Sequence, residues 1–383
     1  MKKLIWVTTV AQSMVLFKGQ LNFMSNHFDL TFVSSNELKP NELGERGMSE
    51  GIQVHELPMK REISLFKDLK SLLAFLSYFH MMKPDAVHGN TPKGALLAML
   101  AAKLTGIRTR IYMCHGLRYQ GCSGIMRRIL ESMEKLTCAC ATQVLCVSDG
   151  VKKTLAKDGI CPARKSRVIG YGSCNGINKD FFDASAYSQE EKEGLRNQYG
   201  ISKDDFLFIF MGRIVKDKGV NEMIEAFTRY RKENPRVRLL ILGAFENEQN
   251  PVDARVQDVI RGNQDGVVYG GRQSDVRPFL AASQCLLLPS YREGFGMVLM
   301  EAGAMGVPVI SSDIIGCNNV VTEDNGLLVE PRNADDLYRK MKRMVEDTAL
   351  YQHFAASTRP SIVNRFDQQR LWNEFLAYYQ RII

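Results

Sequence analysis

Short apolar runs alternate with amphipathic segments in the first half of the chain, and this alternation predicts repeated pairs of strand and helix. The predicted strands are Leu4–Val10, Leu30–Val33, Gln53–Leu57, Ala86–His88, Thr109–Met113 and Gln143–Val147. The predicted helices between them are Leu65–Met82, Lys93–Thr105, Gly124–Cys138 and Gly150–Asp158. Strands that alternate with helices predict a parallel sheet that is covered on both faces.

A polar, highly charged segment from Asn175 to Lys203 interrupts this pattern, and a second series of strands and helices follows it. The strands of this series are Phe206–Met211, Arg238–Leu242, Val267–Tyr269, Cys285–Leu288, Val307–Ile310 and Gly326–Val329. Its helices are Glu222–Glu233, Asp253–Arg261, Asp275–Ala282, Ala334–Asp347 and a last helix, Phe366–Ile383, in which Trp372, Phe375 and Tyr379 have helical spacing. The pattern therefore predicts an α/β protein of two doubly wound parallel-sheet (Rossmann-like) domains that face each other across a cleft.

The composition is that of a globular protein. Of the 383 residues, 45% are hydrophobic and 24% are charged, which excludes a disordered chain. No apolar run approaches the ~20 residues that a membrane-spanning helix requires. The segment Met1–Val7 resembles the start of a signal peptide, but Thr8 and Thr9 break its apolar run and no small-residue cleavage site follows. We therefore interpret it as a buried strand and expect the protein to stay in the cytoplasm.

The nine cysteines do not indicate a disulfide framework, because their number is odd and no Cys-x-x-Cys pair or zinc-ligand spacing occurs. We interpret them as small buried hydrophobic side chains. The sequence therefore predicts no metal site built on cysteine.

Charge is unevenly distributed between the two halves. Residues 1–180 hold 25 Lys and Arg against 14 Asp and Glu, a net +11, whereas the remainder holds 25 against 28, a net −3. A basic first half is expected to face an anionic partner, either a membrane surface or a phosphorylated acceptor. Nucleic acid is not expected, because no Lys/Arg-rich tract or aromatic binding motif accompanies the charge. A basic surface that is merely solvated is the alternative.

The stretch Ser290–Glu301 carries the strongest indication of chemistry. It follows the predicted strand Cys285–Leu288 and leads into a predicted helix, Val298–Met305. Glu293 and Glu301 therefore flank a glycine-containing turn at the carboxyl end of a strand, where open α/β sheets bind ligands. The first N–H groups of a helix can bind a phosphate, and carboxylates can accept hydrogen bonds from hydroxyl groups. A phosphate site next to a polyol site indicates a nucleotide sugar.

Two basic side chains are expected near the same turn. Arg213 and Lys218 follow the predicted strand Phe206–Met211, and they can bind a diphosphate through charge-assisted hydrogen bonds. No Gly-x-Gly-x-x-Gly turn follows the first strand and no Walker lysine motif occurs, which argues against a dinucleotide or P-loop site. Asp-x-Asp is also absent, so we expect these cations, rather than a metal, to neutralise the diphosphate.

These segments together resemble family 4 of the retaining glycosyltransferases. The resemblance lies in Gly212-Arg213 with Lys218, in Pro289-Ser290 with Glu293–Gly296, and in Glu301-Ala302. It implies the GT-B fold. It further implies that residues 1–175 form an acceptor-binding domain, that residues 176–364 bind the nucleotide sugar, and that helix 365–383 crosses back onto the first domain.

The resemblance also implies roles for single residues. Glu301 would bind the ribose hydroxyls, and Glu293 would bind the donor sugar together with the backbone of neighbouring residues. Arg213 and Lys218 would neutralise the diphosphate, and His115 would reach the sugar from the first domain. The donor-binding set also comprises Gly212, Arg272 near the base, Phe295, Gly296, Met297, Val298 and Asn175, and the acceptor set comprises Phe17, Lys18, Gly19, Asn90 and Arg118.

The implied reaction is the retaining transfer of a hexose or N-acetylhexosamine from a nucleotide sugar to a saccharide acceptor, without a cofactor. The donor would be a UDP-sugar, with GDP as the alternative nucleotide. A single glycine, Gly19, stands where many members have a Gly-Gly turn, and with the segment His88–Gly94 this resembles the transferases of capsule, O-antigen and lipid-linked oligosaccharide assembly. Two alternatives are a nucleotide-sugar 2-epimerase of the same fold and a non-catalytic protein that binds sugar nucleotides.

Two segments of the first half have the pattern of helices that lie on a membrane. Lys60–Lys70 is rich in cations and continues into the apolar residues Leu72–Phe79, and Ile125–Leu130 combines apolar and basic side chains. They predict that the protein binds the inner face of the plasma membrane as a peripheral protein and meets a lipid-linked acceptor there. In the alternative interpretation, each apolar stripe packs against its own sheet.

Overall fold

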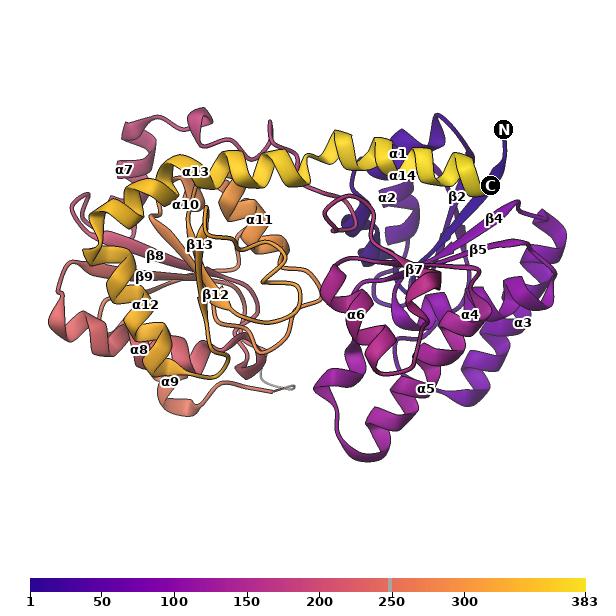
Figure 1. Ribbon diagram of the computed structural model, residues 1–383, viewed down its shortest axis with the longest axis horizontal. Coiled ribbons are helices and arrows are strands. Elements are labelled where there is room, and N and C mark those ends of the chain that lie inside the picture. Colours follow the sequence, from indigo (N-terminus) through magenta and orange to yellow (C-terminus); the bar gives the residue numbers. More distant parts are fainter. Residues whose placement is uncertain (247–249) are drawn as a thin grey trace. The chain divides into compact units, whose positions relative to one another are not determined.

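The computed structural model describes residues 1–246 and 250–383. The chain forms two compact units (Figure 1): Met1–Gly176 together with Gln368–Ile383, called unit 1, and Ile177–Asp367, called unit 2. Each unit contains one fully parallel sheet flanked by helices. The predicted fold class of two doubly wound parallel sheets is therefore confirmed.

The sheet of unit 1 has seven strands in the order β3-β2-β1-β4-β5-β6-β7. They are β1 (Lys3–Val7), β2 (Asp29–Ser34), β3 (Gln53–Glu56), β4 (Ala86–Gly89), β5 (Thr109–Cys114), β6 (Gln143–Cys146) and β7 (Ser166–Arg167). From β1 the chain proceeds through β2 to β3 at one edge of the sheet. From β4 it proceeds through β5 and β6 to β7 at the other edge. Right-handed crossovers therefore place helices α1 (Gln20–Ser25) and α2 (Glu42–Glu50) on one face. The other face carries α3 (Leu65–Met82), α4 (Pro92–Leu104), α5 (Gly124–Cys140) and α6 (Asp149–Lys157).

The sheet of unit 2 has six strands in the order β10-β9-β8-β11-β12-β13. They are β8 (Phe206–Met211), β9 (Val237–Leu242), β10 (Val267–Gly271), β11 (Cys285–Leu288), β12 (Val309–Ser312) and β13 (Gly326–Val329). The helices are α7 (Gln189–Gln198), α8 (Val220–Glu233), α9 (Ala254–Arg261), α10 (Arg277–Ala281), α11 (Met297–Ala304), α12 (Ala334–Glu346) and α13 (Thr348–Phe366). Except for the edge strand β10, the strands are almost completely buried, as expected for a sheet covered on both faces.

The last helix, α14 (Gln368–Ile382), packs on unit 1 through its apolar face. Tyr379 is fully buried, and its hydroxyl lies 2.9 Å from Nδ1 of His88. Trp372 donates a hydrogen bond from Nε1 to Oδ1 of Asn175 at 2.7 Å. The carboxyl-terminal segment is therefore part of the core of the amino-terminal unit.

Several predicted boundaries were wrong. The first strand ends at Val7 rather than Val10, and the chain continues through Thr8 and Thr9 into a 3-10 helix, η1 (Ala11–Phe17). The last predicted helix, Phe366–Ile383, corresponds to α14, which begins two residues later because Asp367 has an extended backbone between α13 and α14. The sequence pattern missed α13, because its apolar and polar residues are spread around the helix and Pro360 lies inside it.

The pattern also missed the short or polar helices α1, α2 and α7. Helix α7 lies in the segment that was interpreted as a polar connection, and its only buried residue is Arg196. Its start nevertheless has a local sequence signal, since Ser188 and Glu191 form a capping box. Hydrophobic periodicity cannot identify a helix that buries so little apolar surface.

The cysteines within the structure are all free, and only Cys122 among them is not buried. In the part of the chain that the structure describes, no helix is both long enough and apolar enough to cross a bilayer.

Candidate functional site

The predicted donor-site segments meet at the carboxyl edge of the sheet of unit 2. Strands β8 and β11 are hydrogen-bonded neighbours, although α8, β9, α9, β10 and α10 lie between them in sequence. The chain leaves β8 toward β9 and β10, and leaves β11 toward β12 and β13. The carboxyl ends of β8 and β11 therefore form a topological switch point, which is where open α/β sheets bind ligands.

At this switch point, the carboxylate of Glu293 is held by Ser290 and Lys218, two residues of the predicted motifs. Its Oε1 accepts a hydrogen bond from Oγ of Ser290 at 2.9 Å and forms an ion pair with Nζ of Lys218. Ser290 is completely buried, and the side chains of Lys218 and Glu293 are 19% and 15% exposed. The structure thus brings together Lys218 and Glu293, but it pairs them with each other. From the sequence, Lys218 was expected to neutralise the diphosphate together with Arg213, and no pairing with Glu293 was foreseen.

The two loops are joined by residues that no sequence motif indicates. The carboxylate of Asp217 accepts hydrogen bonds from Nε and Nη2 of Arg292 at 2.9 and 2.6 Å. The backbone oxygen of Asp217 also accepts from N of Tyr291 at 2.8 Å. No local signal identifies these pairs, because the partners belong to loops far apart in sequence. Together they fix the turn that carries Glu293 against the loop that carries Lys218.

Gly219 permits this close approach. Its φ is +67°, and a Cβ on it would lie 2.0 Å from the backbone oxygen of Pro289. We predict that Gly219→Ala destabilises the protein by about 3 kcal/mol or more, because it combines a strained backbone with a clash against a backbone atom. Chemical denaturation measures this change. Gly200→Ala is the matched control, since Gly200 has a φ of +65° but no atom within 4 Å of its added Cβ, and it should lose only about 1 kcal/mol. Equal losses in the two variants would contradict the role of the contact.

Arg213 lies directly after β8 and Gly212. Its Nη1 is 2.8 Å from Oε2 of Glu246, and the two side chains are 57% and 41% exposed. An exposed ion pair of this kind contributes little to stability. A diphosphate, which carries more negative charge than one carboxylate, could therefore displace Glu246 without a large cost.

Glu301 lies within α11 and has an unusual environment. Burial raises the pKa of its carboxyl group from 4.5 to about 7. No hydrogen bond or ion pair to this carboxylate occurs in the described residues. A carboxylate in such a position can accept hydrogen bonds from the hydroxyl groups of a ligand.

The remaining predicted donor residues are distributed around this centre. The amide of Gly296 donates to the oxygen of Gly316 at 3.0 Å, and the amide of Met297 donates to the oxygen of Phe295 at 2.9 Å. These two of the predicted backbone donors are thus engaged within the protein, and Val298 follows them in the first turn of α11. Arg272 is exposed and follows β10, two strands away from β8, so it lies apart from the Lys218–Glu293 pair.

In unit 1, the structure brings His115 together with two predicted acceptor residues. Nε2 of His115 lies 3.1 Å from Oδ1 of Asn90, and its ring contacts that of Phe17 with 5.8 Å between centroids. These residues follow β5, β4 and β1, so they lie at the switch point of the seven-stranded sheet. Burial lowers the pKa of His115 to about 4, which keeps the imidazole neutral at physiological pH. His115 can therefore exchange hydrogen bonds there, but it carries no positive charge.

Asn175 lies in unit 1, next to the point where the chain passes into unit 2. Its Nδ2 donates to the backbone oxygen of Lys18 at 3.1 Å, and its Oδ1 accepts from Trp372. The side-chain amide thus ties η1 to α14. Gly19 lies at the same place, where an added Cβ would be 2.8 Å from the Trp372 ring. Arg118 is exposed at the start of a short 3-10 helix, Arg118–Gly121.

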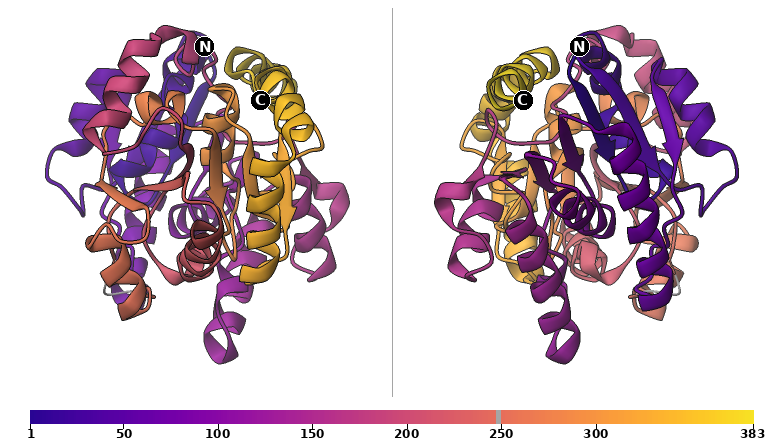
Figure 2. Two further views of the ribbon diagram at one scale, coloured as in Figure 1. Left: turned by 90° about the vertical axis from the view of Figure 1, so that its left-hand side faces the viewer. Right: turned by 90° about the vertical axis from the view of Figure 1, so that its right-hand side faces the viewer.

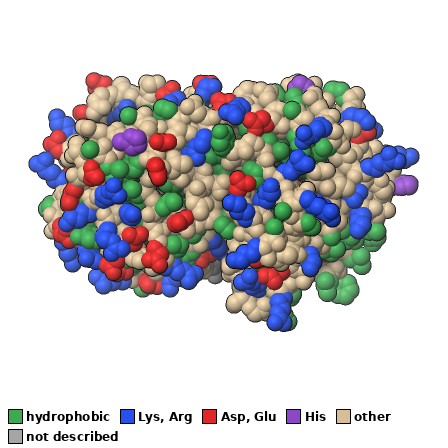
Figure 3. Space-filling model, in the orientation of Figure 1, with side chains coloured by type: hydrophobic (Ala, Val, Ile, Leu, Met, Phe, Trp, Pro, Cys, Tyr) green, Lys and Arg blue, Asp and Glu red, His purple; other side chains and the backbone are tan. Residues whose placement is uncertain are grey.

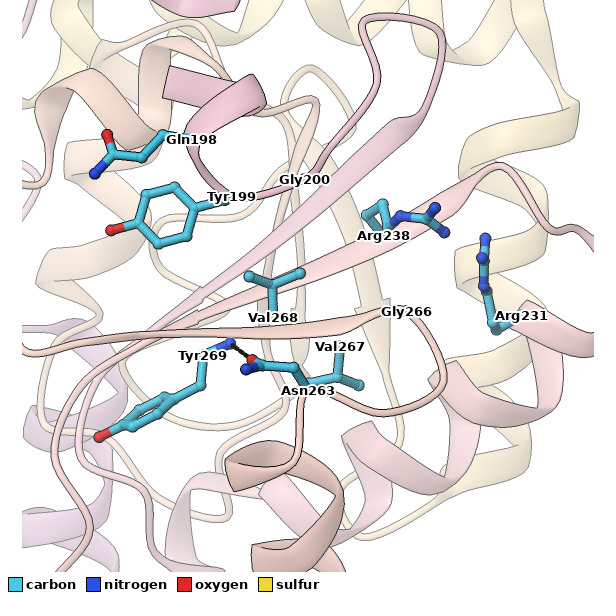
Figure 4. A pocket seen from close by; sticks show the side chains of 10 residues that line it. All are labelled: Gln198, Tyr199, Gly200, Arg231, Arg238, Asn263, Gly266, Val267, Val268 and Tyr269. Atoms are coloured by element: carbon cyan, nitrogen blue, oxygen red, sulfur yellow. Dashed lines mark hydrogen bonds between the residues drawn. The ribbon is translucent and has the colours of Figure 1, made fainter. Parts of the chain in front are cut away.

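A pocket of about 490 Å³ lies elsewhere, around the amino ends of β9 and β10 (Figure 4). Arg231 and Arg238 line one side of it, and Tyr199 and Tyr269 line the other. Arg238 forms an ion pair with Asp205 at 3.3 Å, and Arg231 donates to the oxygen of Val237 at 3.0 Å. The pocket contains none of the predicted site residues, and its cations are used internally. Within the described residues, no group of three or more His, Cys, Asp or Glu side chains is arranged to hold a metal ion.

Two family models match the chain. The model of glycosyl transferases group 1 matches residues 191–360, and that of the glycosyl transferase 4-like domain matches residues 28–172. The first match contains the switch-point residues of unit 2, and the second contains Asn90 and His115.

The relatives of the chain include named bacterial glycosyltransferases. The chain is 33% identical to the capsular polysaccharide biosynthesis glycosyltransferase CapM of Staphylococcus aureus, over 100% of this chain and 98% of the relative. It is 28% identical to the Escherichia coli UDP-Gal:alpha-D-GlcNAc-diphosphoundecaprenol alpha-1,3-galactosyltransferase, over 80% of this chain and 78% of the relative. The crystal structure of Anabaena HepE in complex with UDP has a TM-score of 0.81 and 19% identity, with 100% of both chains covered, which shows a shared fold.

Proposed function

The chain belongs to the family of group 1 glycosyl transferases, and from this premise we propose that it moves a hexose or N-acetylhexosamine from a UDP-sugar to a lipid-linked saccharide during assembly of a surface polysaccharide. The observation that carries the proposal is the pair Lys218–Glu293 at the switch point of unit 2, close in sequence to the unpartnered carboxylate of Glu301. Such a site offers a cation for a phosphate and carboxylates for hydroxyl groups.

The names of two relatives support the choice of donor and acceptor. The Escherichia coli relative uses UDP-Gal and a diphosphoundecaprenol-linked GlcNAc, according to its name. A Campylobacter jejuni relative, 25% identical over 85% of this chain, is named for transfer to another diphosphoundecaprenol-linked sugar. We infer that the acceptor here is also carried on a lipid diphosphate, and that the protein works on the cytoplasmic face of an anionic membrane.

We propose a reaction with retention of configuration and without a protein nucleophile. The bond between the anomeric carbon and the diphosphate oxygen breaks while Arg213 and Lys218 stabilise the leaving diphosphate. The acceptor oxygen forms the new bond on the same face of the sugar, and its proton passes to an oxygen of the departing phosphate. Glu293 binds the hydroxyl groups of the sugar, and neutral His115 exchanges a hydrogen bond with it.

Incubation with a panel of UDP- and GDP-sugars and a lipid-linked saccharide tests this proposal. We expect net transfer, with an α-linkage from an α-linked donor that NMR of the product identifies. Isomerisation of the donor without transfer would indicate an epimerase. Binding without any conversion would indicate a sugar-nucleotide-binding protein, and either outcome would overturn the proposal.

We also predict that a chelator leaves the rate of transfer unchanged within about twofold, because fixed cations supply the positive charge at the diphosphate. The rate is measured after dialysis against EDTA and again after addition of Mg²⁺ or Mn²⁺. An absolute requirement for either ion would contradict the assignment of Arg213 and Lys218.

A further inference from the structure

Exposed apolar side chains are concentrated in unit 1. Of the 17 large hydrophobic residues that are exposed in the described parts of the chain, only Phe181 belongs to unit 2. The guanidinium of Arg277 covers the Phe181 ring at 3.6 Å from its centroid. Scattered exposed hydrophobic residues are normal on a protein surface, but a strong concentration on one unit marks an interaction surface.

Half of the exposed apolar residues of unit 1 lie at the starts of α3 and α5. These are Ile63, Leu65, Phe66, Leu69 and Leu73 near α3, and Ile125, Met126 and Ile129 in α5. Leu65 and Phe66 are 84% and 89% exposed, and Ile125 is 77% exposed. We call these eight residues the α3–α5 surface.

Helix α3 has two separate apolar stripes. At about 100° per residue, Leu65, Phe66, Leu69 and Leu73 fall within an arc of about 100°. The residues that α3 buries, Ser71, Phe75, Tyr78 and Phe79, lie on the opposite side. The inner stripe packs on unit 1, so packing does not account for the outer stripe. The alternative interpretation from the sequence therefore holds for Phe75 and Phe79, which pack within unit 1, but it does not account for the outer stripe.

The starts of α3 and α5 lie on the same face of the seven-stranded sheet, at the edge formed by the carboxyl ends of its strands. Helix α4 packs against both α3 and α5, and all three begin after the carboxyl ends of parallel strands. The proposed acceptor residue Asn90 and the proposed catalytic residue His115 follow two of those strand ends, so both lie at this edge too. In Figures 1 and 2 the first turns of α5 extend beyond the neighbouring helices, and Figure 3 shows hydrophobic side chains gathered where α3 lies.

Basic side chains flank the apolar residues. Lys67 and Lys70 are exposed beside the outer stripe of α3, and Arg128 and Lys135 are exposed on α5. None of these four forms an ion pair in the described residues, whereas Arg127 is paired with Glu131 at 2.7 Å. Apolar side chains bordered by unpaired cations are complementary to an anionic lipid surface. The apolar side chains can be buried at the headgroup region, and the cations are attracted to the lipid phosphates.

We propose that the α3–α5 surface binds directly to the headgroup region of an anionic bilayer, with Leu65 and Phe66 inserted and Lys67 and Lys70 against the lipid phosphates. This inference deepens the proposed function, because it places the acceptor edge of unit 1 next to the membrane that carries a lipid-linked acceptor. We propose a lipid bilayer rather than a protein as the partner, since the α3–α5 surface is formed near the starts of two helices and is not a groove.

Co-sedimentation with vesicles tests the proposal on the full chain without donor or acceptor. We expect binding to phosphatidylcholine vesicles that contain phosphatidylglycerol, and little binding to phosphatidylcholine alone. The double variant Leu65→Ser and Phe66→Ser should bind at least about tenfold more weakly. The matched control is Met81→Ser, because Met81 is 69% exposed at the other end of α3, and it should bind within twofold of the parent.

The cationic contribution is tested in the same assay. Lys67→Gln and Lys70→Gln should each weaken binding about fivefold at low salt, whereas Lys232→Gln, an exposed lysine of unit 2, should not. Phe66→Trp keeps an aromatic side chain at the surface and should report insertion as a blue shift of its fluorescence and as quenching by brominated lipids.

Three outcomes would overturn the proposal. They are no binding to anionic vesicles at low salt, an equal loss of binding in the Met81→Ser control, or self-association that Leu65→Ser and Phe66→Ser abolish in the absence of vesicles. Transfer to a water-soluble saccharide, measured separately, tests the proposed enzymatic function alone. A failure of one proposal is therefore distinguishable from a failure of the other.

Discussion

Replacement of both Arg213 and Lys218 by alanine is expected to lower the turnover number of glycosyl transfer by about 10²–10⁴-fold. Each of these side chains can form a charge-assisted hydrogen bond to the leaving diphosphate, which contributes about 1.5–3 kcal/mol. The effect is expected in the turnover number because the charge on the diphosphate increases as the glycosidic bond breaks. Steady-state kinetics with a saturating nucleotide sugar measures it.

The two single variants should differ. Among the residues that the structure describes, Arg213 is paired with the exposed Glu246 alone, so Arg213→Ala should leave stability unchanged and affect catalysis alone. Lys218 is paired with Glu293, so Lys218→Ala leaves a largely buried carboxylate without its cation. We therefore expect Lys218→Ala to raise the KM for the donor as well as to lower the turnover number.

Arg343→Ala is the matched control for Arg213. Arg343 forms an ion pair with Asp347 in the same unit, and its side chain is 53% exposed, close to the 57% of Arg213. The Arg343→Ala variant should transfer sugar from the donor at the rate of the parent. A double Arg213 and Lys218 variant within about threefold of the parent would contradict the proposed role of the two cations.

The second large effect is expected for Glu301→Gln, which should weaken UDP binding by about 10–100-fold at pH 8. A carboxylate that accepts two hydrogen bonds from ribose contributes about 1.5–3 kcal/mol, and an amide oxygen accepts more weakly. In the parent, affinity should fall as the pH is lowered from 8 to 6, because the pKa of Glu301 is about 7 and the charged form is lost. Calorimetric titration with UDP at several pH values measures both changes.

The same substitution should have the opposite effect on stability. The pKa of Glu301 is about 7 in the folded chain against 4.5 in an exposed carboxyl group, so the unfolded state releases its proton first as the pH rises. The protonated folded form is therefore favoured at low pH, and stability decreases between about pH 4.5 and pH 7. Glu301→Gln should increase the free energy of unfolding at pH 8 by about 1–3 kcal/mol and change it little near pH 4.

Glu323→Gln serves as the control, because Glu323 is an exposed glutamate of the same unit. It should change neither the affinity for UDP nor its dependence on pH. A Glu301→Gln variant that binds UDP as tightly as the parent at every pH would contradict the assignment of Glu301 to the ribose.

Much of the architecture follows from the sequence pattern alone. Buried parallel strands such as Phe206–Met211 are continuous apolar runs, and α3 has apolar side chains at helical spacing, so both were predicted with their observed bounds. The polar helix α7 escaped prediction because it buries too little apolar surface to leave a periodic pattern, and the 3-10 helix η1 escaped because its seven residues are too few to show a helical period.

The site was predictable in its residue types but not in its pairings. The sequence located Glu293, Arg213 and Lys218 at strand ends, because a turn after an apolar run can be recognised locally. It could not show that Lys218 binds Glu293, that Glu246 binds Arg213, or that Asp217 joins the two loops through Arg292. It also could not show that the side chain of Asn175, which stays a predicted donor residue, bonds Lys18 and Trp372 in unit 1.

The sequence by itself thus determined the family, the α/β class, the order of the elements and the kinds of side chain at the strand ends, since these depend on short-range patterns. The tertiary structure decided which strand ends are neighbours, because the order of strands in a sheet is fixed by crossovers and not by sequence distance. It also decided which apolar stripe of α3 is buried and which is exposed, because the helix pattern contains both stripes and only packing against unit 1 distinguishes them.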